Sequence, residues 1–334
     1  RAETIKSRFS PAGANPDKHE IPRKIVWAIT IVVPFIVAVT NWLMVELESC
    51  LVSFKFGALR SLLESDGMAA GIFAFMGFCC LCASAAAAFV FVVSPICAGS
   101  GIPEAKGYLN GNRIPGMFMP KNFPVRTIGV VLATAASFPI GREGPMVCIG
   151  GCVGVNVVDF MARKFFEERV KMSSKVSAVM VHEERFQHAR RVGGIFGAAA
   201  GIAVAFNAPV GAILYVFEEV TVVSWPAEAT FRAFFVTVCA SLGSNALLTL
   251  MGSDVHRLLI YQDQYHGERD WHWSDLPFLV ALAAAAGVLS ACFTKLALGV
   301  WTRRRSLLPK MQFVPYARVL EAGLYALFVA ACLC

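Results

Sequence analysis

The stretch TIGVVLATAASFPIGREGPMVCIGGCVGVNVV, residues 127–158, decides how this chain folds, because the charged pair Arg142 and Glu143 interrupts it. The uncharged runs on either side hold roughly 15 residues each, whereas a helix needs about 20 to cross the hydrocarbon core of a bilayer. Two half-length helices around a glycine-rich break are typical of a discontinuous membrane helix pair, with the break near the middle of the bilayer. Backbone that is irregular at that depth must line a cavity or be buried in protein.

The composition of the whole chain points to a membrane environment. Of its 334 residues, 57% are hydrophobic and only 16% are charged, and the mean hydropathy is +0.61. One soluble core does not bury so much apolar surface. We therefore expect an all-α, multi-pass integral membrane protein whose membrane domain covers residues 25–334. The other long uncharged stretches are Ile25–Val45, Met68–Pro103, Val192–Phe217, Ala233–Met251 and Pro277–Phe293.

The charged residues indicate how the chain is oriented in the membrane. Six Lys or Arg precede Ile25 and eight lie within residues 163–191, but only two lie within residues 252–276, where acidic residues dominate. Because cytosolic segments are enriched in Lys and Arg, we expect the first two regions to be cytosolic and the third to be an external loop. Residues 1–24 are then a cytosolic tail. The formal net charge of +7 does not gather on one basic face with interleaved aromatic residues, so the sequence does not favour nucleic-acid binding.

Eleven cysteines do not suggest a metal or redox framework. Nearly all of them lie in apolar segments, where cysteine behaves as a small hydrophobic residue. Cys148 and Cys152 share a helix face, but no histidine or carboxylate ladder lies near them in the sequence. We therefore expect neither a metal site nor a bound cofactor.

A second interruption lies at Asn207-Ala208-Pro209, within the uncharged stretch 192–217. Proline removes a helical hydrogen bond and clashes with the preceding turn, so we expect two short helices there. Glycines recur every four residues before this break and also after the first break, and such faces let helices approach closely. They are Gly193, Gly197 and Gly201 in one group and Gly150 and Gly154 in the other.

Residues 99–104, Gly-Ser-Gly-Ile-Pro-Glu, predict the start of a helix, because proline suits the first helical turn. Such a start exposes unpaired backbone N–H groups and a partial positive potential, so Ser100, Gly101 and Ile102 can bind an anion without a full cationic charge. Binding of this kind suits an ion that must leave again. The alternative is an ordinary helix start that Ser100 caps and whose dipole Glu104 favours. On these residues alone both interpretations remain open.

The motif Gly141-Arg142-Glu143-Gly144-Pro145 repeats this design and adds an ionisable pair at membrane depth. Ionisable residues are costly there and are usually functional. At this helix start the Glu143 carboxylate can occupy an anion site, and protonation would neutralise it and release it. One side chain would then couple proton and anion occupancy. The alternative is an Arg142–Glu143 ion pair at a membrane surface, although adjacent helical residues point in different directions.

Glu218 and Glu219 follow Tyr215-Val216-Phe217 at the end of an apolar run. A carboxylate at a helix C-terminus opposes the helix dipole, so this placement is locally unfavourable. A role in accepting protons would justify the placement, and a simple water boundary is the other interpretation.

Together, the runs Gly99–Glu104, Gly141–Pro145 and Gly201–Glu219 resemble the CLC family of chloride channels and chloride/proton exchangers, in which they occur in this order. The resemblance covers roughly Lys24 to the C-terminus and implies a CLC-type bundle with broken and re-entrant helices. Residues 163–191 are least like the family pattern.

The resemblance also implies roles for individual residues. In the family, the residue matching Ser100 coordinates the central chloride, and serine there goes with a preference for chloride over nitrate. Glu143 matches the gating glutamate, and the backbone amides around Arg142 and Gly144 match the outer anion site. Glu219 matches the internal proton-transfer glutamate, which exchangers usually keep and typical channels replace.

The resemblance thus favours voltage-gated-type chloride transport, with chloride/proton antiport gated by Glu143 and a passive chloride channel as the alternative. It implies chloride as the transported ligand, protons and the lipid bilayer as partners, and a homodimer. The family's second inverted half supplies another anion-binding helix start and a coordinating tyrosine; neither is recognisable here, so we expect an incomplete second repeat. An intramembrane enzyme that uses Glu143 as an acid is a different class, but it lacks a recognisable nucleophile–base pair.

Overall fold

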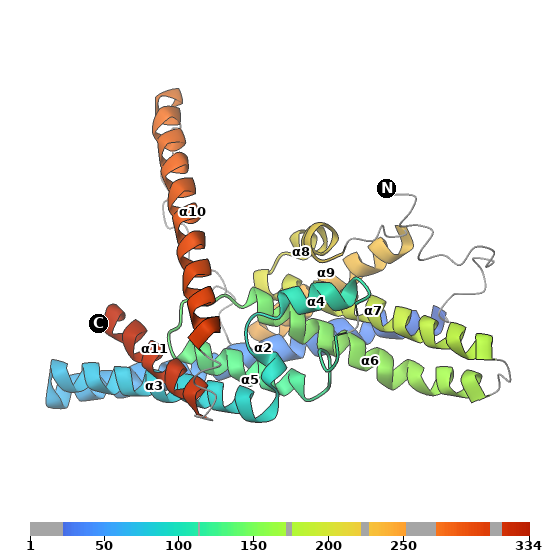
Figure 1. Cartoon of the computed structure of the whole chain (residues 1–334), viewed down its shortest axis with the longest axis horizontal. Helices are drawn as coiled ribbons and strands as arrows, with labels where there is room; N and C mark the ends of the chain where they lie inside the picture. Colours follow the sequence, from blue (N-terminus) through green and yellow to red (C-terminus); the bar gives the residue numbers. More distant parts are fainter. Residues whose placement is uncertain (1–22, 113, 172–175, 222–226, 252–271, 308–315) are drawn as a thin grey trace.

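The computed structural model describes residues 23–112, 114–171, 176–221, 227–251, 272–307 and 316–334. In these residues the chain is mainly helical and contains no β-strand (Figure 1). The α-helices are α2 (Arg23–Asp66), α3 (Met68–Val93), α4 (Ile102–Leu109), α5 (Asn122–Ala135), α6 (Glu143–Lys171), α7 (Val176–Phe206), α8 (Pro209–Tyr215), α9 (Ala227–Leu250), α10 (Leu276–Leu307) and α11 (Ala317–Leu333). The shorter described elements are the 3₁₀ turns η2 (Pro95–Cys97) and η5 (Trp273–Asp275) and the π-helical turn η3 (Val216–Val220).

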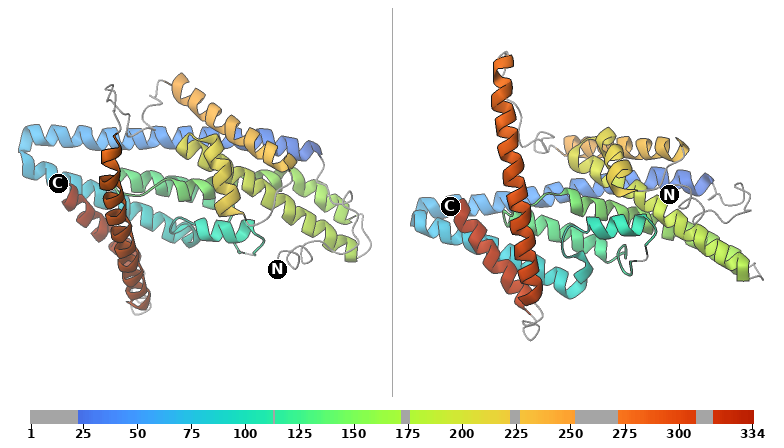
Figure 2. Two further views of the ribbon diagram at one scale, coloured as in Figure 1. Left: turned by 90° about the horizontal axis from the view of Figure 1, so that it is seen from above. Right: turned by 45° about the horizontal axis from the view of Figure 1, so that its top comes forward.

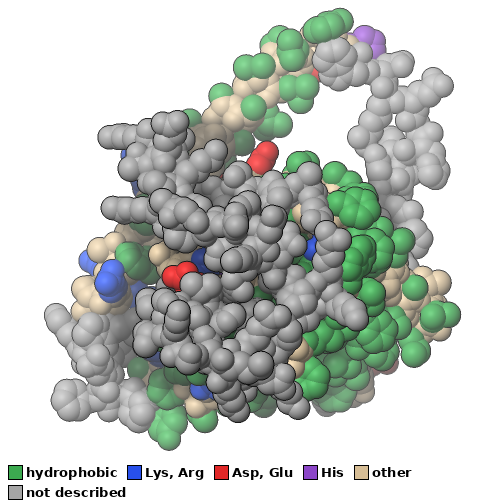
Figure 3. Space-filling model, turned by 90° about the vertical axis from the view of Figure 1, so that its right-hand side faces the viewer, with side chains coloured by type: hydrophobic (Ala, Val, Ile, Leu, Met, Phe, Trp, Pro, Cys, Tyr) green, Lys and Arg blue, Asp and Glu red, His purple; other side chains and the backbone are tan. Residues whose placement is uncertain are grey.

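Six of the described helices are long and apolar enough to cross a membrane. Their membrane-length stretches are Val26–Ser65, Met68–Val93, Glu143–Met161, Phe186–Phe206, Ala229–Leu250 and Trp273–Ser306. Large hydrophobic side chains such as Phe35, Phe73 and Leu242 are exposed on these helices, as expected for surfaces that face lipid. Figure 3 shows hydrophobic side chains gathered into a broad surface on one side of the molecule. The expected all-α, multi-pass integral membrane protein is confirmed.

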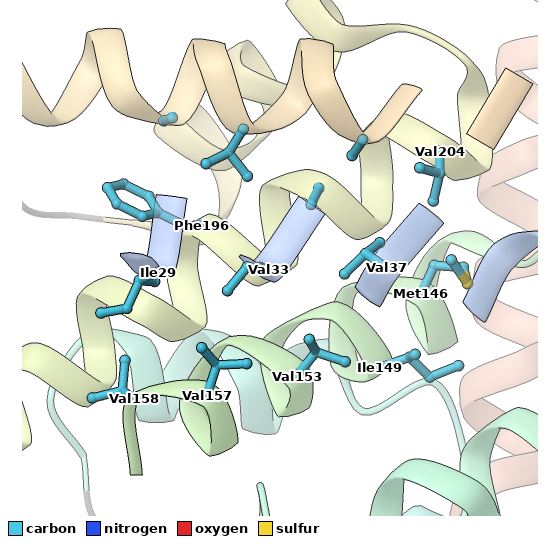
Figure 4. Close-up of a cluster of buried hydrophobic side chains, with 14 of the residues drawn as sticks. Ile29, Val33, Val37, Met146, Ile149, Val153, Val157, Val158, Phe196 and Val204 are labelled. Carbon is cyan, nitrogen blue, oxygen red and sulfur yellow. The ribbon is translucent and has the colours of Figure 1, made fainter. Parts of the chain in front are cut away.

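The interior of the bundle forms where α2 lies against α6 and α7. Val33 and Val37 of α2 lie in one buried cluster with Ile149 and Val153 of α6 and Phe196 of α7 (Figure 4). Burial of branched and aromatic side chains in a close-packed interior makes any change of volume costly. This contact therefore holds α6, which begins with the glycine-flanked motif, against the N-terminal third of α2.

The two glycine faces that the sequence predicts lie against each other in the pair α6 and α7. A methyl group on Gly150 would overlap the carbonyl of Gly197, and one on Gly154 would overlap the carbonyl of Gly193. Gly201 approaches the backbone of the first turn of α6 in the same way. Backbones come this close only where no side chain intervenes, so the predicted packing role is confirmed.

Both predicted helix breaks are present, but only one helix beside each break is short. α5 and α8 have 14 and 7 residues, whereas α6 and α7 have 29 and 31. The segments 163–171 and 176–191, which we expected to form a basic loop, are instead the ends of α6 and α7. Lys, Arg and Glu are good helix formers, so these helices continue beyond their apolar stretches. The predicted tail up to residue 22 and the predicted external loop from 252 to 271 lie outside the described residues.

α10 stands apart from the other helices, as Figures 1 and 2 show. Its side chains from Leu276 to Ser306 are all exposed. By contrast, α11 lies along α3, where a methyl group on Gly323 would meet Ser84 Oγ at 2.8 Å. The two glycine-flanked helix starts therefore belong to the part of the bundle built from α2 to α8.

Candidate anion site

The first helix start, that of α4, is not capped by its serine. Gly101 is the N-cap residue and adopts a left-handed conformation with φ 72°, which glycine allows without strain. Ser100 Oγ lies 3.5 Å from the backbone nitrogen of Ile102, which is too long for a good hydrogen bond. The capping interpretation is therefore wrong. Ser100 is exposed and lines the cavity described below.

A buried arginine on α5 holds the backbone of this loop. The Arg126 guanidinium donates hydrogen bonds to the carbonyl oxygens of Ile96, Gly99 and Ser100, at 3.1, 3.3 and 3.4 Å. Arg126 is only 4% exposed. Its fork of donors matches several carbonyls at once, so it fixes the loop and leaves a positive charge beside it. Sequence reasoning missed Arg126, although a cation inside an apolar run was an available signal.

The second helix start, that of α6, lies directly against the first. Glu143 is the first residue of α6, and the Met146 N–H donates to the Arg142 carbonyl at 2.9 Å. Gly144 is buried, and a methyl group on it would meet Ser100 Cβ at 2.7 Å. The positive ends of two helix dipoles therefore converge on one place.

The Glu143 side chain is exposed and folds back over its own helix start. A methyl group on Gly141, just before the helix, would overlap the Glu143 carboxylate. The first N–H groups of a helix have no partner within the helix, so negative charge is favoured at this position.

Both helix starts line one cavity of about 940 Å³. The rest of its walls come from α3, η2, α5, α11 and the segment 138–141, together with Arg304 of α10, and most of the lining is apolar. The polar and charged side chains among its lining residues are Ser100, Arg126, Glu143, Arg304, Arg318, Glu321 and Tyr325. A mostly apolar cavity with a few converging polar groups has the form of a ligand site.

The side chain of Arg142 is held by α2 rather than by its neighbour Glu143. Arg142 Nη2 forms an ion pair with Glu48 Oε2, and Thr134 Oγ1 of α5 donates to Glu48 Oε1 at 3.0 Å. Glu48 is 7% exposed. The Arg142–Glu143 ion pair considered from the sequence is therefore wrong. Sequence reasoning missed Glu48, which stands out as a carboxylate within an apolar helix of membrane length.

The two carboxylates after α8 lie at the other end of α4. Glu218 and Glu219 belong to the π-helical turn η3 and are both exposed. Lys106, in the last turn of α4, lies 3.6 Å from Glu219 by the closest charged atoms. The Tyr215 hydroxyl, on α8, interacts electrostatically with the carboxylates of Glu219 and Glu143. Glu219 thus lies near a short helix whose opposite end is the Ser100 loop.

The cysteines around the site act as hydrogen-bond donors. Cys148 Sγ donates to the Ser100 carbonyl and Cys152 Sγ donates to the Met119 carbonyl, each at 3.4 Å. Among the described residues, no group of three or more His, Cys, Asp or Glu side chains is arranged to hold a metal ion. Cys148 therefore supports the backbone of the Ser100 loop, and Cys152 supports the backbone just before α5.

The fold and this site together define a multi-pass membrane protein whose broken helices meet at a candidate anion site. The family model for the voltage gated chloride channel matches residues 81–333. The chain therefore belongs to this family, the CLC family, as the three sequence motifs predict.

Named relatives agree with this assignment. The chain is 30% identical over 307 residues to chloride channel protein D of Dictyostelium discoideum, which covers 92% of this chain and 29% of the relative. It is 28% identical over 267 residues to H(+)/Cl(-) exchange transporter 7 of Homo sapiens, covering 73% of this chain and 30% of the relative. The chain thus spans less than a third of the length of these relatives.

Solved structures share the fold. A slow cyanobacterial Cl⁻/H⁺ antiporter superposes with a TM-score of 0.67 at 18% identity, over 91% of this chain and 63% of the antiporter chain. A eukaryotic CLC transporter superposes with a TM-score of 0.62 at 19% identity, over 92% of this chain and 50% of the other. The predicted CLC-type bundle is therefore confirmed.

Proposed function

We propose that the protein to which this chain belongs transports chloride across a membrane in exchange for protons. The observation that carries this proposal is the contact between Gly144 and Ser100, which brings two helix N-termini together at one cavity. Membership in the voltage gated chloride channel family and the similarity to an H(+)/Cl(-) exchange transporter support it.

The anion is bound by polar groups of the two helix starts. Ser100 provides a hydroxyl, and Gly101, Ile102, Arg142 and Gly144 provide backbone N–H groups or the close approach that makes them accessible. N–H groups at helix starts favour an anion without a full opposing charge, which allows rapid release.

Glu143 is the gate of this site. Its carboxylate lies over the start of α6, where it competes with chloride for the same positive potential. Protonation removes its charge and ends that competition, so chloride can enter when Glu143 takes up a proton. Exchange of the two ions follows from this mutual exclusion.

Glu219 passes protons between the water on its side of the membrane and Glu143. It is exposed and lies near α4, whose other end is the Ser100 loop. Glu218, beside it on η3 and also exposed, is a second candidate for this role. Tyr215 of α8 interacts electrostatically with both Glu143 and Glu219, the two ends of this proton route.

The test is ion flux in liposomes that contain the full-length protein, with a chloride gradient and a pH electrode. We expect chloride flowing down its gradient to drive protons uphill. Glu219→Ala should abolish proton movement while chloride flux continues, and Glu143→Ala should do the same because its gate is lost. Glu64→Gln is the matched control, since Glu64 forms only an exposed pair with Arg60 on the same helix as Glu48.

Each outcome of this test decides between functions. If the unaltered protein shows chloride flux without uphill proton movement, the protein is a passive chloride channel and not an exchanger. If Glu219→Ala keeps full proton coupling, Glu219 does not transfer protons, and Glu218 becomes the candidate for that role. The absence of chloride flux would refute the proposal as a whole.

A further inference from the structure

Two buried charges of opposite sign on α2, Glu48 and Lys55, contact the connection between α5 and α6. We propose that both are positioning residues that hold the segment 136–142 and thereby set the orientation and electrostatic surroundings of Glu143. The inference rests on the proposed role of Glu143 as the gate. It concerns residues that neither touch the anion cavity nor belong to the three motifs.

Glu48 holds the end of the segment that leads into α6. It receives the Arg142 guanidinium and, on its other oxygen, a hydrogen bond from Thr134 Oγ1 at 3.0 Å. The carboxylate thus ties the residue just before Glu143 to the last turns of α5. Because this ion pair is largely buried, loss of one partner leaves the other charge uncompensated.

Lys55 holds the end of the segment that leaves α5. Its Nζ donates to the Ala135 carbonyl at 3.0 Å and to Ser137 Oγ at 2.7 Å. A cation at a helix C-terminus satisfies unpaired carbonyls and complements the helix dipole. Lys55 is 4% exposed, and its Nζ lies 4.9 and 5.4 Å from the ring centroids of Phe56 and Phe75. These contacts hold the ammonium group at the C-terminal end of α5.

Glu48 and Lys55 are seven positions apart, which is about two helical turns, so one face of α2 presents both. The segment between their contacts includes Ser137, whose φ of 61° is rare for a residue other than glycine. A conformation of that kind persists only where its surroundings impose it, and Lys55 donates directly to this residue. The two contacts therefore fix the path of the chain into α6.

The pair with Glu48 also determines the charge near the gate. Arg142 precedes Glu143 directly, and without the Glu48 carboxylate its positive charge beside the gate would no longer be neutralised. Such a cation favours the ionised form of the gate and strengthens its competition with chloride. The other charged or titratable side chains that line the cavity with Glu143 are Arg126 of α5, Arg304 of α10, and Arg318, Glu321 and Tyr325 of α11, and Tyr215 of α8 interacts electrostatically with Glu143. None of these residues is substituted in the variants below.

The experiment measures chloride flux against pH in liposomes that contain the full-length protein. In Glu48→Gln, we expect the pH of half-maximal flux to fall by about one unit, because an unpaired Arg142 stabilises the Glu143 carboxylate. In the double variant Glu48→Gln with Arg142→Gln, the cation is gone as well, and the midpoint should return to that of the unaltered protein. If Glu48 had only a structural role, the flux midpoint of the double variant would differ from that of the unaltered protein at least as much as the midpoint of Glu48→Gln does.

Lys55 is tested by the ratio of protons to chloride. Lys55→Met removes the two hydrogen bonds to Ala135 and Ser137. The segment before Glu143 is then less firmly held, and the ratio of protons to chloride should fall at least twofold. Lys55→Gln keeps an N–H₂ donor and should restore most of the ratio. A fall in thermal stability without a change in the ratio would reduce Lys55 to a structural residue and overturn its part of the inference.

The controls separate this inference from the function it rests on. Glu143→Gln should abolish the pH dependence of flux; if it does not, the gating role itself fails. If Glu143→Gln behaves as expected but Glu48→Gln leaves the midpoint unchanged, only the positioning role is wrong. Should Glu48→Gln not fold, Glu48→Asp keeps the charge on a shorter side chain and should shift the midpoint in the same direction by less. An unshifted Glu48→Asp would then overturn the inference.

Discussion

Substitution of Gly144 by alanine tests the geometry of the anion site directly. A Cβ at this position would lie 2.7 Å from Ser100 Cβ and 3.3 Å from Ser100 Cα. Carbon atoms pack at about 3.5–4.0 Å, so the added methyl group must displace Ser100 by ~1 Å. Overpacking of this kind costs about 1–3 kcal/mol, which is a factor of about 5–150 in an equilibrium constant. We therefore expect Gly144→Ala to weaken chloride binding roughly within that range.

The assay is calorimetric titration of chloride into the purified full-length protein, with thermal unfolding measured in parallel. Gly129→Ala is the matched control, because Gly129 lines the same cavity but a methyl group there meets Val90 Cγ2 at an ordinary 3.7 Å. This control should bind chloride as the unaltered protein does. Equal chloride affinity in Gly144→Ala and Gly129→Ala, with Gly144→Ala as stable as the control, would refute the contact between the two helix starts as a determinant of the site.

Two further substitutions test the supports of the site. Arg126→Lys replaces a fork that donates to three carbonyls by a single ammonium group, so chloride affinity should fall about tenfold in the same titration; an unchanged affinity would contradict the role of the guanidinium. Gly154→Val should overlap the Gly193 carbonyl and lower the stability of the fold by about 1–3 kcal/mol or more, as measured by thermal unfolding, whereas Gly77→Val, with open space around it, should not.

The helix breaks were predictable because their signals are local. Glycine, proline and an ionisable pair within five positions mark the start of α6, and Asn207-Ala208-Pro209 marks the end of α7 in the same way. Asn207 indeed has a φ of 52°, and its Oδ1 accepts a hydrogen bond from Asn245 Nδ2 of α9 at 2.8 Å. Helix lengths were less predictable, because hydropathy reports where a helix leaves the apolar core and not where its hydrogen bonds end.

Contacts between distant parts of the chain were not predictable in this way. Glu48 and Arg142 are 94 positions apart, and Lys55 and Ser137 are 82 positions apart. From a single sequence, a carboxylate or a lysine inside an apolar helix predicts that some partner exists but does not identify it. The helix starts were therefore visible from the residues, whereas the side chains that hold them became visible only in the fold.

The partners of the two arginines decide what kind of anion site this is. Arg126 and Arg142 both lie beside the helix starts, and two uncompensated guanidinium groups there would make the site strongly cationic. One unpaired unit charge at 4 Å is worth about 4 kcal/mol at the effective dielectric constant of a protein surface, enough to slow the release of an anion about a thousandfold. In the fold, Glu48 pairs with Arg142, and three carbonyl oxygens engage Arg126. The attraction for an anion therefore comes from two helix dipoles, each equivalent to roughly half a charge, and from the guanidinium of Arg126, whose charge the carbonyl oxygens do not neutralise. Because Glu48 neutralises Arg142, this potential is weaker than that of two free guanidinium groups, and the carboxylate of Glu143 can compete against it.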